Sequence, residues 1–114
     1  LQAVATPKHF AVHSGPEATR LSFNSVVSER DLRETYLPAF EACFSAGAAS
    51  VMTAYNAVNG EPCSTNSRLI GDILRNEWGF QGAVVTDAGA GVALHKEHRR
   101  VADYPEAVAK ELAS

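Results

Sequence analysis

The sequence predicts an α/β fold with a parallel sheet, because three strand–loop–helix units follow one another along the chain. The expected strands, residues 2–9, 50–55 and 82–86, are short and apolar, as in a sheet that is buried on both faces. Strands that alternate with helices imply parallel strands joined by right-handed crossovers. Two architectures fit this order of elements: an open doubly wound sheet and a stretch of a (β/α)8 barrel.

The first unit begins with the strand at 2–9, where Pro7 weakens the prediction because proline donates no hydrogen bond to a sheet. A polar loop leads to Ser28, a hydroxyl N-cap with an acidic residue three positions further on. The helix that follows should bend at Pro38, which lacks a backbone donor, and end at Gly47. Its apolar stripe consists of Leu32, Tyr36, Leu37, Phe40 and Phe44.

The second unit combines the strand at 50–55 with a helix at about 67–78. The apolar face of that helix consists of Leu69, Ile70, Ile73, Leu74 and Trp78. The third unit continues from the strand at 82–86 into a glycine-rich loop. A last helix is expected to start at Asp103, which caps it, with Pro105 in the first turn.

Composition and charge exclude several classes of protein. With 46% hydrophobic and 20% charged residues, the chain is typical of a globular domain. A net charge of −3 without a basic stripe argues against nucleic-acid partners, and no apolar run approaches the roughly 18 residues that a membrane span needs. The first residues lack the features of a signal peptide, and the chain is expected to be a piece of a longer protein. Cys43 and Cys63 are expected to be reduced thiols, one on a helix and one in a loop.

Polar side chains gather where the three predicted strands end. Lys8 and His9 end the first strand, Tyr55 and Asn56 the second, and Asp87 follows the third. The carboxyl ends of parallel strands meet at one edge of a sheet, where ligands bind in both architectures. The loops that follow are also longer than the usual roughly 2 to 6 residues. The sequence therefore predicts a binding site at this edge.

Four blocks of sequence together resemble the barrel domain of glycoside hydrolase family 3. They are KHFAVHSGPE, VSERDLRETYLPAFE, SVMTAYNAVNGEP and EWGFQGAVVTDAGA, which stand in the family's order. The resemblance is closest to the β-xylosidase and β-glucosidase branch. It implies a partial (β/α)8 TIM barrel, residues 1–114 being a fragment of about three of the eight βα units. It also implies that no cofactor is needed and that the substrate is an oligosaccharide or aryl glycoside with a terminal β-D-xylosyl or β-D-glucosyl residue.

The resemblance assigns the catalytic nucleophile to Asp87, at the end of GAVVTD. A retaining glycosidase needs an ionised carboxylate on one face of the anomeric carbon and a carboxylic acid on the other, about 5–5.5 Å apart. Without the resemblance, a role of Asp87 as the N-cap of a short helix is an equal alternative. In the family the acid usually lies on a following domain. The fragment alone is therefore expected to be inactive and to need that domain and the rest of the barrel.

The resemblance also implies which residues bind the substrate. Lys8 and His9 match a lysine–histidine pair that hydrogen-bonds hydroxyl groups of the sugar. Tyr55 matches a tyrosine that can donate its hydroxyl to the nucleophile, and Met52 and Arg20 are candidates for the pocket wall. The alternatives are a solvated Lys8, a core position for His9, barrel packing for Met52 and a surface position for Arg20.

Two details of these motifs carry further expectations. Consecutive residues of a regular strand point to opposite faces, so Lys8 and His9 cannot both reach one sugar from such a strand. We therefore expect distorted backbone around these residues and Phe10, and a non-proline cis peptide is one form that it can take. Ala88 stands where the family often has tryptophan or cysteine, which leaves the reaction unchanged and affects the sugar specificity.

Three other readings remain open from the residues alone. Gly89 and Gly91 after a strand form part of a dinucleotide-binding turn, but the third glycine of GxGxxG is missing. His95 and His98 share a helical spacing that suits a metal, but no third ligand is evident and a solvated loop is expected instead. Finally, the chain can be a non-catalytic barrel remnant, since three units would leave two open sheet edges.

Overall fold

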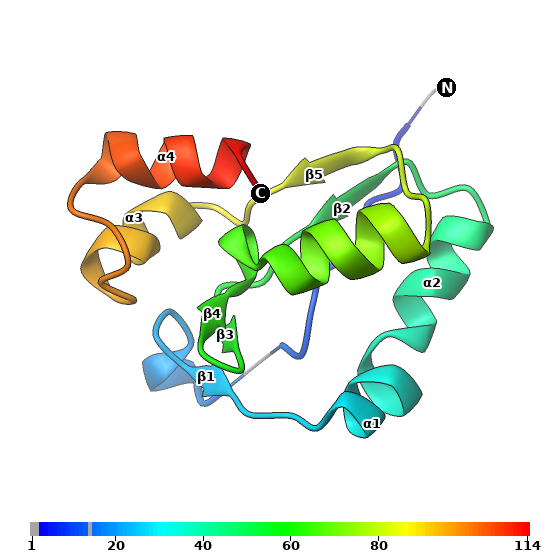
Figure 1. Cartoon of the computed structure of the whole chain (residues 1–114), viewed down its shortest axis with the longest axis horizontal. Coiled ribbons are helices and arrows are strands. Elements are labelled where there is room, and N and C mark those ends of the chain that lie inside the picture. Colours follow the sequence, from blue (N-terminus) through cyan, green and yellow to red (C-terminus); the bar gives the residue numbers. More distant parts are fainter. Residues whose placement is uncertain (1–2, 14) are drawn as a thin grey trace.

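The protein has a mixed α/β fold around two parallel strands, in a computed structural model that describes residues 3–13 and 15–114 (Figure 1). Strand β2 (Ser50–Met52) pairs in parallel with β5 (Ala83–Val85), and Val51 lies opposite Val84. The predicted parallel pairing of these segments is therefore confirmed, although each strand is shorter than predicted. Among the described residues, β5 pairs with β2 alone.

The segment that ends at Phe10 runs along the other edge of β2 without forming the strand predicted at 2–9, whose Gln2 lies outside the described residues. Phe10 makes one isolated parallel bridge, and its N–H donates to the Met52 carbonyl oxygen at 2.8 Å. The Met52 N–H donates in turn to the Pro7 carbonyl oxygen at 3.2 Å. The prediction of a regular strand was wrong because Pro7 has no N–H to continue the ladder.

The first predicted helix forms and is irregular at Pro38, as expected. It consists of three pieces, α1 (Glu29–Asp31), the wide-turned η2 (Leu32–Tyr36) and α2 (Pro38–Ser45). The Ser28 hydroxyl caps it and accepts a hydrogen bond from the Asp31 N–H at 3.0 Å. Proline cannot supply the donor of a regular turn, so the helix axis is interrupted where α2 begins. Gly47, with φ of 97°, follows the end of α2.

Helix η4 (Arg68–Glu77), yellow-green in Figure 1, lies across the two parallel strands. Its predicted apolar face is buried, except that Trp78 at its end is only partly buried against the core. The main core draws its large side chains from the first two units and the turn before β5, and includes Phe10, Leu32, Leu37, Val51, Leu69, Ile73, Leu74 and Phe80. Each fully buried side chain of this size contributes about 1.5–3 kcal/mol, so the core fixes the segments that end at the predicted site.

The two long loops after Phe10 and after β2 are joined by a small sheet. Its strands are β1 (Asn24–Ser25), β3 (Ala57–Val58) and β4 (Glu61–Pro62), and the short helices η1 (Glu17–Thr19) and η3 (Cys63–Thr65) flank it. The Asn59 side chain accepts from the Val27 N–H at 2.9 Å and donates to the Val27 carbonyl oxygen at 3.0 Å. The Asn24 side chain accepts from the Gly60 N–H at 2.7 Å. Two segments predicted as separate loops therefore form one unit.

Helix α3 (Ala90–Lys96) occupies a segment that was predicted as a glycine-rich loop, so that prediction was wrong. It packs against α4 (Tyr104–Leu112), and Leu94 between them is fully buried. A Cβ atom on Gly91 would lie 3.0 Å from Cε2 of Tyr104. Gly91 therefore allows the two helices to approach each other closely. The packing between them stabilises α3 despite the low helix propensity of glycine.

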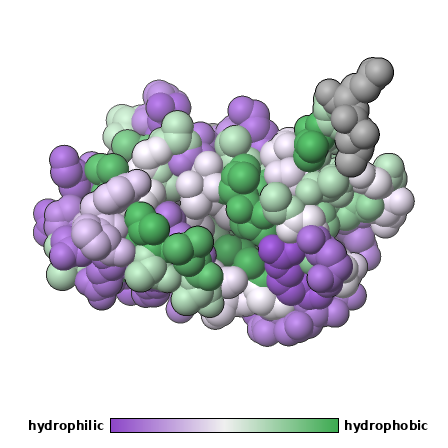
Figure 2. All heavy atoms as spheres, turned by 90° about the horizontal axis from the view of Figure 1, so that it is seen from above, coloured by the Kyte–Doolittle hydropathy of each residue, from purple (hydrophilic) through white to green (hydrophobic). Residues whose placement is uncertain are grey.

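An apolar area lies across the face seen from above in Figure 2. The half-exposed Val85 of β5 and the exposed Val108 and Leu112 of α4 line a hollow of about 520 Å³. Exposed apolar surface beside β5 agrees with the expectation of open apolar faces in three βα units. None of the described helices is long and apolar enough to cross a membrane.

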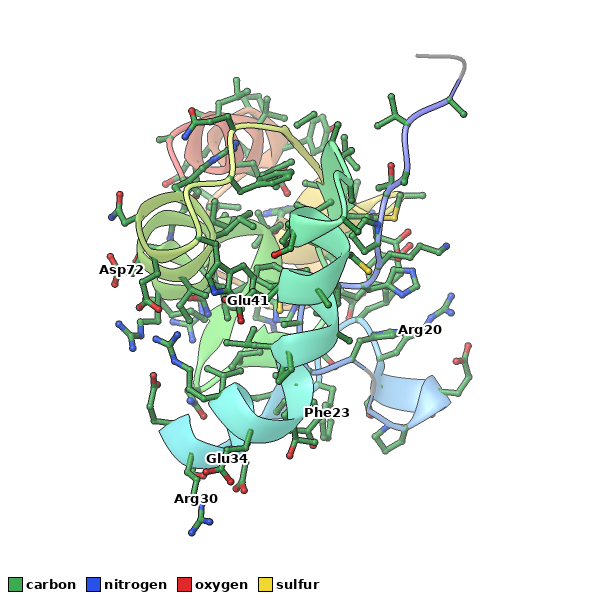
Figure 3. All side chains as sticks on the ribbon, turned by 90° about the vertical axis from the view of Figure 1, so that its right-hand side faces the viewer. Arg20, Phe23, Arg30, Glu34, Glu41 and Asp72 are labelled. Atoms are coloured by element: carbon green, nitrogen blue, oxygen red, sulfur yellow. The ribbon has the colours of Figure 1, made fainter. Side chains whose placement is uncertain are left out.

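A group of ion pairs joins the first helix to η4. Arg33 donates to Glu29 at 2.8 Å and, with both terminal nitrogens, to Glu77, one of these bonds measuring 2.7 Å. The bonds to Glu77 link elements far apart in sequence, whereas the bond to Glu29 lies within one helical turn. Arg30 and Glu34 lie side by side at one end of the same helix in Figure 3 and also pair within one turn, at 3.0 Å.

Candidate active site

Asp87 lies directly beyond β5, at the carboxyl end of the sheet. Its carboxylate is 17% exposed, and its Oδ2 is 3.2 Å from Nε2 of His9. The other carboxylate oxygen accepts from the Ala88 N–H at 2.7 Å. Both oxygens therefore have partners, and the carboxylate keeps a small exposed surface at the edge where the sequence predicted a binding site.

The backbone around Lys8 and His9 is distorted, as expected. The Lys8–His9 peptide bond is cis, and so is the Phe10–Ala11 bond. His9 is 22% exposed and contacts Asp87, whereas Lys8 is exposed and lines a neighbouring hollow with His9. The structure thus brings both side chains to the same end of the sheet, and His9 does not take the core position that was its alternative.

The His9 ring is held in its neutral form. Burial, followed by the charge of His13, lowers the pKa of His9 below its ordinary value, and Lys8 acts in the same direction. The Asp87 carboxylate raises this pKa without reversing the net effect. A neutral imidazole has one N–H, and Nε2 lies 3.2 Å from Oδ2 of Asp87, so the tautomer with its proton on Nε2 is the one that suits this contact.

Tyr55 lies beside the carboxylate. Its hydroxyl donates to the Ala88 carbonyl oxygen at 2.6 Å. The Asp87 carboxylate is a second hydrogen-bond partner of the same hydroxyl, and the expected donation to this carboxylate stays a prediction. Burial and the Asp87 charge raise the pKa of Tyr55, so the phenol stays protonated at neutral pH.

Arg20 and Met52 lie next to these groups. The Arg20 guanidinium carbon lies 5.6 Å from the centre of the Tyr55 ring, within cation–π range, and Nη1 is 3.3 Å from Glu17. Figure 3 shows Arg20 on the side of the molecule away from Asp72. Met52 is half-buried in β2, where its backbone bonds join the Phe10 segment to the sheet. Arg20 therefore contacts the site through Tyr55, which its alternative surface position did not anticipate.

Three residues around the site differ from what the sequence indicated. Asn56 does not face the site: it is fully buried, and its amide donates to the Ala57 carbonyl oxygen at 3.1 Å. His98 has Nε2 at 2.8 Å from the Tyr55 carbonyl oxygen, and His13 has its ring 4.6 Å from that of His9. Neither histidine follows a predicted strand directly, so their position gave no signal.

The metal interpretation of the histidine pair has no geometric support. His95 has Nδ1 3.3 Å from the Val101 carbonyl oxygen, whereas His98 contacts Tyr55, so the two rings have separate partners. Within residues 3–13 and 15–114, no three histidine, cysteine or acidic side chains are grouped as metal ligands would be. His95 also lies in α3 and not in the solvated loop that was expected.

Comparison with known proteins places this chain in a known family. Residues 2–114 match the description "Glycosyl hydrolase family 3 N terminal domain". The chain is 46% identical over 101 residues to a xylan 1,4-beta-xylosidase of Xylanibacter ruminicola, covering 87% of this chain and 12% of that protein. It is 41% identical over 102 residues to a periplasmic beta-glucosidase of Salmonella typhimurium, covering 89% of this chain and 13% of that one.

Comparison with solved structures points to the same family. The chain superposes on a GH3 exo-beta-xylosidase (XlnD) in complex with a xylobiose aziridine probe with a TM-score of 0.92 and 31% identity, over 99% of this chain and 16% of that one. A beta-glucosidase of Listeria innocua in complex with isofagomine gives a TM-score of 0.85 and 37% identity, over 96% of this chain and 15% of that one. The chain thus spans less than a fifth of the length of these relatives, and it belongs to glycosyl hydrolase family 3.

Proposed function

We propose that this chain supplies the nucleophile of a retaining, exo-acting β-glycosidase, with Asp87 as that nucleophile. The observation that carries the proposal is the 3.2 Å contact between Nε2 of His9 and the Asp87 carboxylate at the carboxyl end of β5, in a chain of this family. In the proposed protein the 114 residues are part of a longer polypeptide. They form about three βα units of a (β/α)8 barrel, an arrangement that the parallel pairing of β2 and β5 supports.

The proposed reaction is a double displacement. An ionised Asp87 attacks the anomeric carbon, the glycosidic bond breaks, and the leaving oxygen takes a proton from a carboxylic acid on the opposite face. Water then hydrolyses the glycosyl ester, and the same acid group, now a carboxylate, takes the proton of that water. The neutral His9 supports this role, because its Nε2, 3.2 Å from Oδ2 of Asp87, helps to fix the orientation of the carboxylate.

The acid group is proposed to come from outside this chain. The acidic residues of the loops near the site have other positions: Glu17 pairs with Arg20 at 3.3 Å, and Glu61 lies in β4. A lone nucleophile cannot protonate a leaving group, so the isolated 114 residues are expected to be inactive. The rest of the barrel and a following domain are the proposed sources of the acid and of the remaining sugar contacts.

The proposed substrates carry a terminal β-D-xylosyl or β-D-glucosyl residue. The names of the similar proteins, which include xylosidases and glucosidases, support this choice. Lys8 and His9 are the proposed partners of the sugar hydroxyls, and Met52 and Arg20 are proposed to line the pocket. Tyr55 is proposed to hold the Ala88 backbone next to Asp87 and to share its hydroxyl proton with the Asp87 carboxylate.

The test is covalent trapping of the glycosyl-enzyme in the longer polypeptide. A 2-fluoro β-xyloside or β-glucoside with a good leaving group should label the protein once, and peptide mapping should place the label on Asp87. Asp87→Ala should abolish labelling. The matched control is Asp72→Ala, an exposed aspartate on η4 that pairs only with Arg68 at 3.6 Å, and it should label like the parent. Labelling that persists in Asp87→Ala would exclude the proposed nucleophile.

The same experiment separates the two alternatives. A non-catalytic barrel remnant would take no label in any form, including the longer polypeptide. A dinucleotide-binding domain using Gly89 and Gly91 would bind a nicotinamide or flavin nucleotide instead, which equilibrium dialysis detects. Gly91 packs closely against Tyr104, so its lack of a side chain is explained without a bound phosphate. This favours the glycosidase over the dinucleotide-binding alternative.

A further inference from the structure

A second histidine beside the site has no role in the reaction proposed above. The centre of the His13 ring lies 4.6 Å from that of His9, and the two ring planes are inclined at 57°. Nε2 of His9 lies 3.2 Å from Oδ2 of Asp87. The three side chains therefore form a continuous row, with the exposed His13 at its outer end and the carboxylate at its inner end.

The backbone that brings His13 to this place is strained. Val12, directly before it, is buried and has φ of 56°. A β-branched residue rarely takes this left-handed conformation, which costs about 1–3 kcal/mol and persists only where surrounding contacts enforce it. The Ser25 hydroxyl donates to the Val12 carbonyl oxygen at 3.1 Å and helps to fix it. The fold thus holds the turn that places the His13 ring against His9.

We infer that His13 is a positioning residue, whose ring packs against His9 and keeps Nε2 of His9 directed at Asp87. The inference deepens the proposed function and relies on it for the importance of Asp87, whereas the contact between the two rings stands independently. His13 touches neither the carboxylate nor, in this proposal, the substrate. Its effect reaches Asp87 only through the His9 ring.

The charged and titratable groups around His9 come from three segments. Lys8 and His13 lie on its own segment, Asp87 lies beyond β5, and Tyr36 of η2 lines the same hollow of about 210 Å³ as Lys8, His9 and His13. Of the two groups on its own segment, His13 contacts the His9 ring directly. After burial, the interaction with His13 is the next cause of the lowered pKa of His9.

Two variants separate the ring from its charge. His13→Phe keeps an aromatic ring on His9 and removes the charge, whereas His13→Ala removes both. His13 is exposed, so neither variant should unfold the protein, and circular dichroism checks this. His95→Ala is the matched control, because the His95 ring contacts the Val101 carbonyl oxygen and neither His9 nor Asp87.

The measurement is a pH titration of the histidine ring signals by nitrogen and carbon NMR in the 114-residue chain, with His9 assigned from His9→Gln. The parent should show one dominant His9 tautomer, with the proton on Nε2. His13→Phe should keep that tautomer and move the His9 midpoint to higher pH. His13→Ala should lose the tautomer preference as well, and His95→Ala should match the parent.

Two results would overturn the inference. One is a His13→Ala spectrum in which the tautomer and midpoint of His9 equal those of the parent. The other is a loss of the tautomer in His13→Phe as complete as in His13→Ala, since ring packing would then not be the cause. These spectra do not depend on catalysis, so their outcome is distinct from that of the Asp87→Ala labelling test. If the isolated chain does not fold, the same variants and signals are compared in the longer polypeptide.

Discussion

The hydroxyl of Tyr55 donates a hydrogen bond to the carbonyl oxygen of Ala88, 2.6 Å away, and so joins the end of one strand segment to the residue after Asp87. Replacing this hydroxyl removes a side-chain bond between the two segments. We expect Tyr55→Phe to lower the free energy of unfolding by about 0.5–1.5 kcal/mol. In the longer polypeptide it should slow labelling by up to about tenfold, the kinetic equivalent of ~1.4 kcal/mol.

The matched control for this hydroxyl is Tyr36→Phe. Tyr36 is 40% exposed on η2, so its hydroxyl can bond to water in either the folded or the unfolded chain. Denaturant unfolding should therefore give the same midpoint for Tyr36→Phe and the parent. Equal midpoints for Tyr55→Phe and the parent would show that the bond to Ala88 contributes nothing.

Gly82 is predicted to tolerate no side chain. A Cβ atom there would lie 2.4 Å from the Ala49 carbonyl oxygen, at the point where β5 approaches β2. Because the backbone atoms of Ala49 cannot move away without a cost in energy, Gly82→Ala should destabilise the fold by about 1–3 kcal/mol. Gly71→Ala is the control, since Gly71 lies within η4 with no atom within 4 Å of its Cβ position, and it should stabilise by up to about 1 kcal/mol. Thermal unfolding of both variants measures these two effects. A Gly82→Ala variant as stable as the parent would contradict the prediction.

The ion pairs of Arg33 should contribute stability at neutral pH and lose it in acid. Hydrogen bonds from Arg33 lower the pKa of both Glu29 and Glu77. A carboxyl group with a lowered folded-state pKa stabilises the fold above its unfolded pKa, and this contribution disappears as pH falls through the folded value. Arg33→Met should therefore lower Tm at pH about 7, and this loss should shrink as the pH falls below the ordinary glutamate pKa and through the lowered folded-state values.

Arg30→Met serves as the control for the loss of an arginine. Arg30 pairs with Glu34 within one turn and is 80% exposed, so this ion pair is worth little in water. Its effect on Tm at neutral pH should be smaller than that of Arg33→Met. An equal effect of the two substitutions, or an Arg33 effect that is the same in acid, would argue against the cross-linking role of Arg33.

The two cysteines should differ sharply in reactivity. Both are free, as the sequence predicted, with Cys43 exposed on α2 and Cys63 buried in η3. Burial raises the pKa of the Cys63 thiol to about 12, which leaves almost no reactive thiolate at pH about 8. Iodoacetamide should thus modify one thiol in the folded chain and two in denaturant. Cys43→Ala should remove the reaction of the folded chain, and rapid native labelling of that variant would show that Cys63 is accessible.

Local sequence signals predicted the elements that depend on local chemistry. Ser28 caps the first helix as expected, and Asp103 caps α4, where its carboxylate accepts from the Glu106 N–H at 2.9 Å. The apolar periodicity of η4 matches its buried face, and Asp87 stands at the end of the strand that predicted it. These features depend on residues a few positions apart, which a single sequence displays directly.

The features that were missed depend on contacts between distant segments. Helix α3 has two glycines near its start and was predicted as loop, yet packing against α4 stabilises it. Tyr55 bonds to Ala88, and His13 and His98 reach the site from loops whose course depends on the fold. Neither propensity nor spacing encodes such approaches, because they arise only when the three units pack together.

The small sheet that joins the two long loops has a consequence for how these loops open. Val27 and Gly60 each donate a backbone N–H to an asparagine side chain on the other loop, through Asn59 and Asn24. Neither loop can move away from the other without breaking these hydrogen bonds. We therefore expect the two loops to open in a single cooperative event. In native-state hydrogen exchange, the amide protons of these two residues should therefore share one opening free energy. The two loops would then move as one dynamic unit, although they belong to different strand–helix units of the chain.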